Sequence, residues 1–288
     1  MPTTEFVSSA HRTDDAGRAT RPLVVCADDY AVHASATAGI LALAHRQRVS
    51  ATSVMVLSPR WPTDAAPLRE CRQHLDVGLH LDFTSPFACA AGFGRSLGGM
   101  MGRTLWPLGA SLRRQWRDAI ERQCDAFEQH WQEAPDHVDG HQHVQQFAGL
   151  RDVLLEVLTR RYDHHPWLRV SQVGQPDLKA AIITRWGARG WQHRLQAAGW
   201  QGLAPLRGAY DFTGGYEAYA HRMRGWLAQA RRDGGLIMCH PAQGVDETDD
   251  IGQARAWEYA YLASDAFAHD LRAAGLHLVR GRALHLPP

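Results

Sequence analysis

"PLVVCADD", at residues 22–29, is a short apolar run that ends abruptly in two acids. Its length and its valines are typical of a buried strand. "SATAGILALAHRQR" follows at residues 35–48, where Ile40, Leu41 and Ala44 recur at helical spacing and predict a helix. The two stretches together predict one strand–helix unit, and the rest of the chain repeats that unit.

The same alternation continues to the end of the chain. Further strands are expected at residues 50–57, 75–82, 136–141, 167–171, 207–212, 234–242 and 276–279. Helices are expected at residues 61–75, 111–131, 150–162, 178–198, 216–232 and 254–275. Seven or eight such units favour a single parallel (β/α) barrel-like domain, a TIM-barrel variant, over the alternative of a doubly wound open sheet. The glycine-rich residues 83–110 are predicted as a long loop that covers a substrate.

The composition fits one large domain that binds neither nucleic acid nor membrane. We expect the polar residues 1–21 to form a flexible N-terminal tail and residues 22–288 to form the barrel domain. A net charge of +1 argues against a protein that binds a phosphate backbone, because such proteins carry a strongly basic face. No apolar run approaches the roughly 20 residues that a membrane-spanning helix needs.

The cysteines indicate a reducing compartment. All five are scattered, and no two of them form a Cys-x-x-Cys pair. The N-terminus also lacks the apolar segment of a secretory signal. We therefore expect a cytoplasmic protein without disulfides, and a homodimer is the default expectation for its oligomeric state.

Polar side chains follow the predicted strands at the points where the strands end. The side chains with catalytic or metal-binding chemistry at these points are Asp28, Asp29, His80, Asp139, His141, His143 and His240. In a parallel barrel the carboxyl ends of all strands meet at one face, where active sites are built. Four distant segments are therefore expected to deliver acids and imidazoles to one pocket.

This set of residue types is typical of a metal-dependent hydrolase. Two imidazoles and a carboxylate form a common open site for a divalent metal. A second carboxylate can take a proton from water, and an imidazolium can protonate the leaving group. Each residue alone also fits a structural role, such as a helix cap or a buried histidine. A barrel phosphoesterase or amidohydrolase and a non-catalytic sugar-binding relic of the fold are the alternatives.

Four motifs occur in a fixed order between about residues 22 and 242. They are "CADDYAVHASATAGI", "VGLHLDF", "DHVDGHQHVQ" and "LIMCHPA". With these motifs the chain resembles the YdjC-like carbohydrate deacetylases, a family that includes chitooligosaccharide deacetylases and a hopanoid-biosynthesis-associated deacetylase. The resemblance implies a barrel-like α/β fold and hydrolysis of the acetamido group of a sugar or glycolipid.

The resemblance also implies a role for each matching residue. Asp29, His80 and His141 match the positions that hold one divalent ion, Mg²⁺ or Zn²⁺. Asp28 matches the proposed general base and His240 the proposed general acid. A first strand that ends in Asp-Asp favours the deacetylase over barrel phosphoesterases, whose first strand often carries a His-x-His pair.

Four further residues are assigned less directly. Asp139 and His143 are expected to support the site or contact the substrate, since a carboxylate commonly orients a ligating imidazole. Arg169, in "LRVS", is expected to pair with Asp28 or with the substrate. Gln145 stands where the family often has a further histidine, which is expected to change the rim of the pocket.

Overall fold

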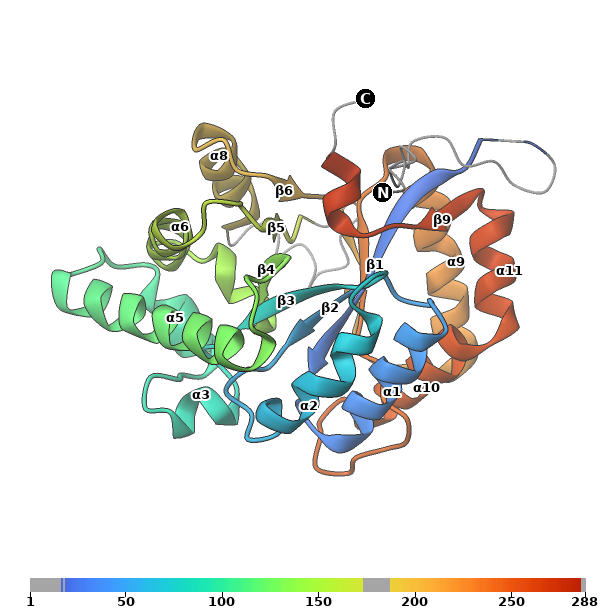
Figure 1. Ribbon diagram of the computed structural model, residues 1–288, viewed down its shortest axis with the longest axis horizontal. Coiled ribbons are helices and arrows are strands. Elements are labelled where there is room, and N and C mark those ends of the chain that lie inside the picture. The colour runs from blue at the N-terminus through green and yellow to red at the C-terminus, as the bar shows by residue number, and fades with distance from the viewer. Residues whose placement is uncertain (1–16, 18, 173–186, 286–288) are drawn as a thin grey trace, which may run out of the picture.

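A parallel sheet that nearly closes into a barrel forms the centre of the structure, with helices around its outside (Figure 1). The computed structural model describes residues 17, 19–172 and 187–285. The strands are β1 (Arg21–Tyr30), β2 (Ala51–Val54), β3 (Asp76–Leu81), β4 (His137–Gly140), β5 (Trp167–Arg169), β6 (Gly202–Leu203), β7 (Leu206–Arg207), β8 (Leu236–Cys239) and β9 (Leu276–Leu278).

The helices lie mainly between successive strands in the sequence. They are α1 (Ala34–His45), α2 (Trp61–Leu68), α3 (Pro86–Ala90), α4 (Leu97–Arg103), α5 (Ala110–Trp131), α6 (Leu150–Arg161), α8 (Arg189–Ala197), α9 (Gly215–Asp233), α10 (Gly252–Ala263) and α11 (Asp265–Ala273). In the described part of the chain, short 3₁₀ helices accompany them: η1 (Arg69–Cys71), η2 (His141–Gln146) and η4 (Gly281–His285).

The two ends of the sheet meet through a very short connection. The strand order is β6-β5-β4-β3-β2-β1-β8-β7, and only Ala204 and Pro205 separate the terminal strands β6 and β7. Across this gap the Leu206 N–H donates to the Gln172 carbonyl oxygen at 2.9 Å. The predicted barrel-like fold is therefore confirmed, and the doubly wound sheet is excluded. β9 pairs separately with the first residues of β1.

Three predicted elements differ from the structure. Residues 83–110 are not a plain loop, because they contain α3 and α4. The strand predicted at 207–212 is reduced to β7, which has two residues. Another two-residue strand, β6, precedes β7 in the sequence. The single helix predicted at 254–275 is two helices, because Ser264 has an extended backbone and its hydroxyl caps α11 by accepting from the Phe267 N–H.

Two predicted elements lie partly outside the described residues. α8 confirms the end of the helix predicted at 178–198, while residues 178–186 are not described. Residues 1–16 and 18 of the predicted tail are likewise not described. Among the described residues, no helix is long and apolar enough to cross a membrane.

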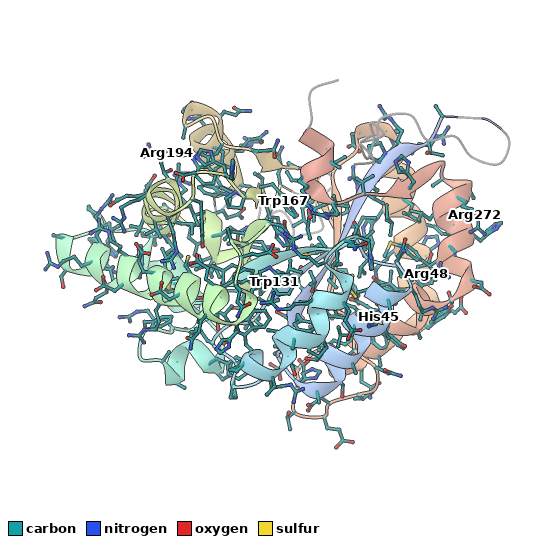
Figure 2. All side chains as sticks on the ribbon, in the orientation of Figure 1. His45, Arg48, Trp131, Trp167, Arg194 and Arg272 are labelled. Atoms are coloured by element: carbon teal, nitrogen blue, oxygen red, sulfur yellow. The ribbon has the colours of Figure 1, made fainter. Side chains whose placement is uncertain are left out.

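Side chains of β1 alternate between two hydrophobic clusters. Leu23, Val25 and Ala27 belong to the large cluster that includes the buried faces of the helices. Val24 and Cys26 belong to a second, smaller cluster inside the ring of strands, whose other buried members include Ala51, Trp167, Leu203, Leu206, Leu236 and Met238. Trp167 is labelled in Figure 2. Because successive strand residues face opposite sides, this inner series determines which later residues face the barrel interior.

Candidate functional site

A polar layer lies directly above the inner hydrophobic cluster. On a strand, side chains two residues apart point to the same face. The residue two positions after each inner-facing side chain therefore also faces the barrel interior. Those next inner positions hold Asp28 after Cys26, Ser53 after Ala51, Asp139 after His137, Arg169 after Trp167 and His240 after Met238. With His80 of β3 they form one group at the carboxyl ends of the strands, in which all but the partly exposed His240 are buried. Alternation along several strands thus builds the site that the sequence predicted at one face of a barrel.

Part of the polar layer, Asp28, His80 and His240, lines a pocket of about 750 Å³. Asp28, Asp29, His80, His141 and His240 all line it. Segments between residues 83 and 110 also contribute side chains to the wall, among them those of α3. This segment therefore borders the pocket, as expected for a substrate loop.

The backbone at Asp29 lets two adjacent carboxylates face one pocket. The register of β1 against β2 shifts between Ala27 and Tyr30, and Asp29 has a φ of 67°. This left-handed conformation is uncommon outside glycine, and aspartate is among the residues that tolerate it. On a regular strand Asp28 and Asp29 would point to opposite faces, whereas here both line the pocket.

Three donor atoms converge on one point in the pocket. Asp29 Oδ1 lies 3.3 Å from His80 Nε2 and 3.3 Å from His141 Nδ1. Ligand atoms at about 2.0–2.2 Å from a common ion are themselves roughly 3.0–3.5 Å apart. The third pair, from His80 and His141, lies within 4.8 Å, so the three residues assigned by resemblance as ligands could hold one divalent ion.

The charges around His80 also suit a cation. His80 Nδ1 lies 2.6 Å from Asp139 Oδ1, so the Nδ1 proton is donated to that carboxylate and Nε2 faces Asp29. Burial alone would lower the pKa of His80, but Asp139, Asp29 and Asp28 raise it to about 10. The site thus favours a positive charge between His80 Nε2 and Asp29, which a proton or a metal ion can supply.

Arg169 joins two carboxylates beneath the pocket. Its Nη1 and Nη2 donate to Asp28 Oδ2 and Oδ1 at 2.5 and 2.6 Å, and Nη2 also lies 2.6 Å from Asp139 Oδ2. The guanidinium is completely buried. Burial would raise the pKa of Asp28, but Arg169 lowers it below its usual value. Asp28 is therefore ionised and fixed in orientation, and Arg169 pairs with Asp28, one of its two expected partners.

His240 and His143 line the pocket as neutral imidazoles. His240 Nε2 lies 4.0 Å from Asp28 Oδ2, and burial lowers the pKa of His240 to about 4. His143 lies beside Ser171, with 3.0 Å between Nδ1 and Oγ, and burial lowers the pKa of His143 to about 3. Both rings are therefore unprotonated near neutral pH.

Gln145 does not lie at the rim of the pocket, so that expectation is wrong. Its side chain is completely buried, and Nε2 donates to the Arg169 carbonyl oxygen and to Ser171 Oγ, both at 3.3 Å. The cause is the backbone of η2, where Gln142 and His143 both have left-handed φ values. Gln145 therefore links η2 to the segment after β5 behind the pocket.

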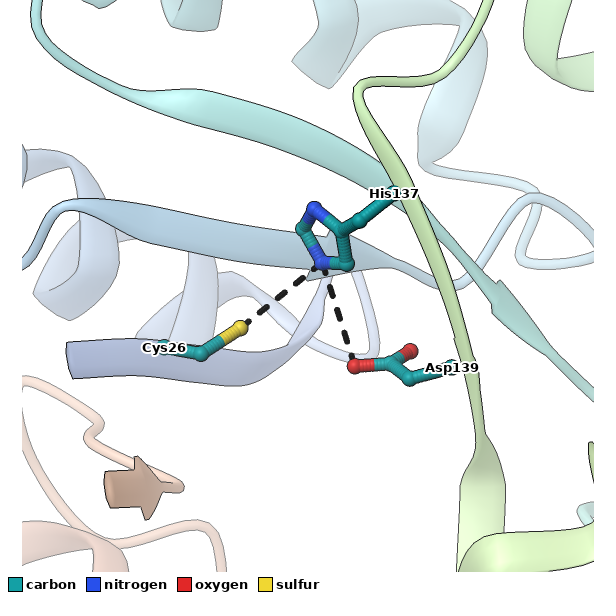
Figure 3. A group of neighbouring side chains, drawn as sticks. All are labelled: Cys26, His137 and Asp139. Atoms are coloured by element: carbon teal, nitrogen blue, oxygen red, sulfur yellow. Dashed lines mark hydrogen bonds and ion pairs between the residues drawn. The ribbon is translucent and has the colours of Figure 1, made fainter. Parts of the chain in front are cut away.

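A second group that could hold a metal lies deeper in the barrel. Figure 3 shows His137 between Cys26 and Asp139, with Nε2 at 3.8 Å from Cys26 Sγ and 3.9 Å from Asp139 Oδ2. Burial raises the pKa of Cys26 and lowers that of His137 to about 4, so both groups are neutral. Arg169 already pairs with Asp139 Oδ2, and the His137 ring stacks on Trp167 at 4.1 Å. This group therefore forms part of the core.

Because His137 is neutral in the fold, the stability of the protein depends on pH. Its pKa is about 4 in the folded protein against 6.5 for the free side chain, so the unfolded chain binds the proton first as the pH falls. The contribution of neutral His137 to the free energy of unfolding is complete above pH 6.5. About 3 kcal/mol of that contribution is lost as the pH falls from 6.5 to 4. In His137→Phe, which retains a ring beside Trp167, urea unfolding should show a smaller loss of stability over this range. Equal pH slopes in the two proteins would contradict the assignment.

The structure adds residues that the sequence did not predict. Arg255 and Asp249 line the pocket although they lie beyond the recognised motifs, and Glu258 accepts the His240 backbone N–H at 2.6 Å. Arg255 and Glu258 lie on α10, whose sequence pattern shows only an amphipathic helix. No local signal in the sequence identifies them.

Comparisons with known proteins agree with this architecture. Residues 22–273 match a family model described as YdjC-like protein. A chitooligosaccharide deacetylase from Proteus mirabilis (strain HI4320) is 29% identical over 140 residues, which make up 46% of this chain and only 54% of that protein. A solved structure of a cellobiose-phosphate cleavage protein from Enterococcus faecalis V583 matches with a TM-score of 0.67 and 21% identity, over 93% of this chain and 100% of that chain. The structural match shows a shared fold.

Proposed function

The chain belongs to the YdjC-like family, and on that basis we propose that it is a metal-dependent carbohydrate deacetylase. The reaction is hydrolysis of the amide that joins an acetyl group to an amino sugar or glycolipid. The observation that carries the proposal is the convergence of Asp29, His80 and His141 beside the separate carboxylate of Asp28. The similarity to a protein named a chitooligosaccharide deacetylase supports the substrate class.

Asp29, His80 and His141 would hold the ion, and the other residues would move protons. A divalent ion there would lower the pKa of water and polarise the substrate carbonyl. Asp28, ionised and fixed by Arg169, accepts a proton from the water as its oxygen bonds to the acetyl carbon. The C–N bond then breaks, and acetate and a free amine are released.

His240 would deliver the proton to the departing amine. Because its pKa is lowered to about 4, His240 is neutral before the reaction and has no proton to give. The proton that the amine gains must therefore be the one that Asp28 takes from the attacking water. Asp28 Oδ2 lies 4.0 Å from His240 Nε2, which is longer than a hydrogen bond, so one water or the substrate amine between them would carry the proton across. Water loses one proton and the amine gains one, so the two residues return to their starting states.

The charge of the pocket favours this reaction over phosphate-ester hydrolysis. Among the described lining residues are Asp28, Asp29, Asp246, Asp249 and Asp250, together with one arginine and no lysine. That arginine, Arg255, already pairs with two of the aspartates. The five aspartates also outnumber the charges of Arg255 and of one divalent ion, so an uncharged acetamido group would meet less repulsion here than an anionic phosphate ester.

A screen for released products tests the proposed function. Purified protein loaded with Mg²⁺ or Zn²⁺ would be incubated with acetamido sugars, their oligomers and phosphate esters of sugars. We expect acetate from at least one acetamido sugar and no inorganic phosphate. Phosphate release without acetate would favour the phosphoesterase, and neither product would favour a non-catalytic sugar-binding protein.

The ion site predicts a defined metal content. We expect one divalent ion per chain, and loss of acetate release when a chelator removes it. His80→Ala should weaken ion binding, because it removes one of three ligands, whereas His74→Ala, a matched change away from the pocket, should not. Calorimetric titration with Zn²⁺ and Mg²⁺ measures both effects. Equal affinity in the two variants would contradict the ligand set.

Two further expectations from the sequence stay predictions. A cytoplasmic location follows from the free cysteines, all five of which are unpaired in the structure. A homodimer is the default oligomeric state, and sedimentation of the purified protein would measure it.

A further inference from the structure

The geometry points to Arg255 as a positioning residue that restricts Asp29 to a single metal-binding oxygen. Arg255 lies on α10 and is almost completely buried at the wall of the pocket. The inference rests on the proposed function, because it concerns how Asp29 would bind the ion. It assigns a role to a residue outside the four sequence motifs.

The two oxygens of Asp29 have separate partners. Oδ1 faces the imidazoles of His80 and His141, at 3.3 Å from each. Oδ2 accepts a hydrogen bond from Arg255 Nη2 at 2.7 Å. A charge-assisted bond of this kind is short and strong, so Oδ2 is not free to turn towards an ion. Asp29 therefore offers one ligand atom, and a bound ion would keep more positions open for water and substrate.

Arg255 is itself held from the opposite side. Its Nε donates to Asp249 Oδ2 at 2.5 Å, and the same oxygen lies 3.1 Å from His33 Nε2. His33 Nδ1 accepts the Ala36 N–H at the start of α1, so the ring proton is on Nε2 and is donated to Asp249. The guanidinium is thus fixed between the end of β1 and the loop before α10.

Asp249 also compensates the charge of Arg255. An unpaired guanidinium next to a metal ligand would repel the ion, and Asp249 supplies a negative charge on the other side. Arg255 can therefore orient Asp29 with a smaller electrostatic cost to ion binding. Removing Arg255 leaves Oδ2 without its partner and lets Asp29 present both oxygens to the ion.

The test is the visible absorption spectrum of the Co²⁺-loaded protein, whose band intensity reports the coordination number. In Arg255→Met we expect weaker bands than in the wild type, because a second Asp29 oxygen joins the ion. We also expect kcat for acetate release to fall about 10–100-fold with KM unchanged. Arg255→Lys, which retains the charge, should restore part of the spectrum.

Arg207→Met is the matched control. Arg207 is equally buried, but it contacts Asp233 and the Gly234 carbonyl oxygen instead of the pocket residues. Its Co²⁺ spectrum should equal that of the wild type. If Arg255→Met does not fold, Asp249→Asn weakens the same arrangement at its outer end and should shift the spectrum in the same direction.

Two results would overturn the inference and can be told apart. A wild-type protein without Co²⁺ bands removes the metal centre of the proposed function and this inference with it. A wild-type protein whose bands are unchanged in Arg255→Met and Asp249→Asn retains the metal centre but shows that Arg255 does not position Asp29.

Discussion

The Asp28→Asn variant is expected to lose about 10²–10⁴ in kcat for acetate release while it retains its fold and its ion. An asparagine oxygen can still accept a hydrogen bond from Arg169, so the buried pair is not left without a contact. The amide cannot take a proton from water, however. Steady-state kinetics together with the metal content of the purified variant would measure both parts of the prediction.

Asp64→Asn is the matched control for this variant. Asp64 is also a buried aspartate with an arginine partner, Arg60, but it lies on α2 and does not line the pocket. Its substitution should leave kcat close to that of the wild type. Full activity in Asp28→Asn would show that another group, such as the neutral imidazole of His240, accepts the proton of the water.

The Arg169→Met variant is expected to be less stable than the wild type by about 3–5 kcal/mol. Its substitution leaves the carboxylates of Asp28 and Asp139 buried without their shared guanidinium. Urea denaturation should show a lower midpoint with a similar m value, since the surface exposed on unfolding changes little. The loss should be largest above the normal titration range of aspartate, where both carboxylates are ionised.

Arg207→Met again gives the comparison. Arg207 is as inaccessible as a core residue, yet its partner Asp233 is half exposed and can be solvated when the arginine is lost. We therefore expect a smaller destabilisation than in Arg169→Met. Equal losses in the two variants would show that the buried charges around Asp28 and Asp139 are not the source of the effect.

The sequence predicted which polar side chains meet at one end of the barrel, because strand alternation carries that information. Cys26 and Asp28 are two residues apart on β1, and His137 and Asp139 are two residues apart on β4. An apolar or neutral inner position is followed by a polar inner position at the strand end. Once a parallel barrel is assumed, this pattern places the polar residues at one face.

Elements that show no hydrophobic periodicity of their own could not be predicted from the sequence. β6 and β7 have two residues each, too few to show alternation, and their pairing depends on β5 and β8. The break at Ser264 is also hidden, because the flanking helices together resemble one long amphipathic pattern. For β6 and β7, pairing with neighbouring strands and not local propensity determines the structure, whereas the break at Ser264 rests on a single local cap.

Long-range contacts within the site were also beyond the sequence. Asp29 and Arg255 are separated by more than two hundred residues, and nothing near Arg255 distinguishes it from an exposed helical arginine. Gln145 was misplaced for a different reason. The left-handed residues Gln142 and His143 turn the chain after β4, and neither residue type requires that conformation.

Mass analysis of a reacted N-acetylglucosamine oligomer tests the central claim most directly. The protein would be incubated with the oligomer after loading with a divalent ion, and in parallel after treatment with a chelator. The proposed deacetylase predicts a product that has lost one acetyl group, with one equivalent of acetate, in the ion-loaded sample only. An oligomer left intact by the ion-loaded protein, or converted equally well after chelation, would contradict the claim for this substrate.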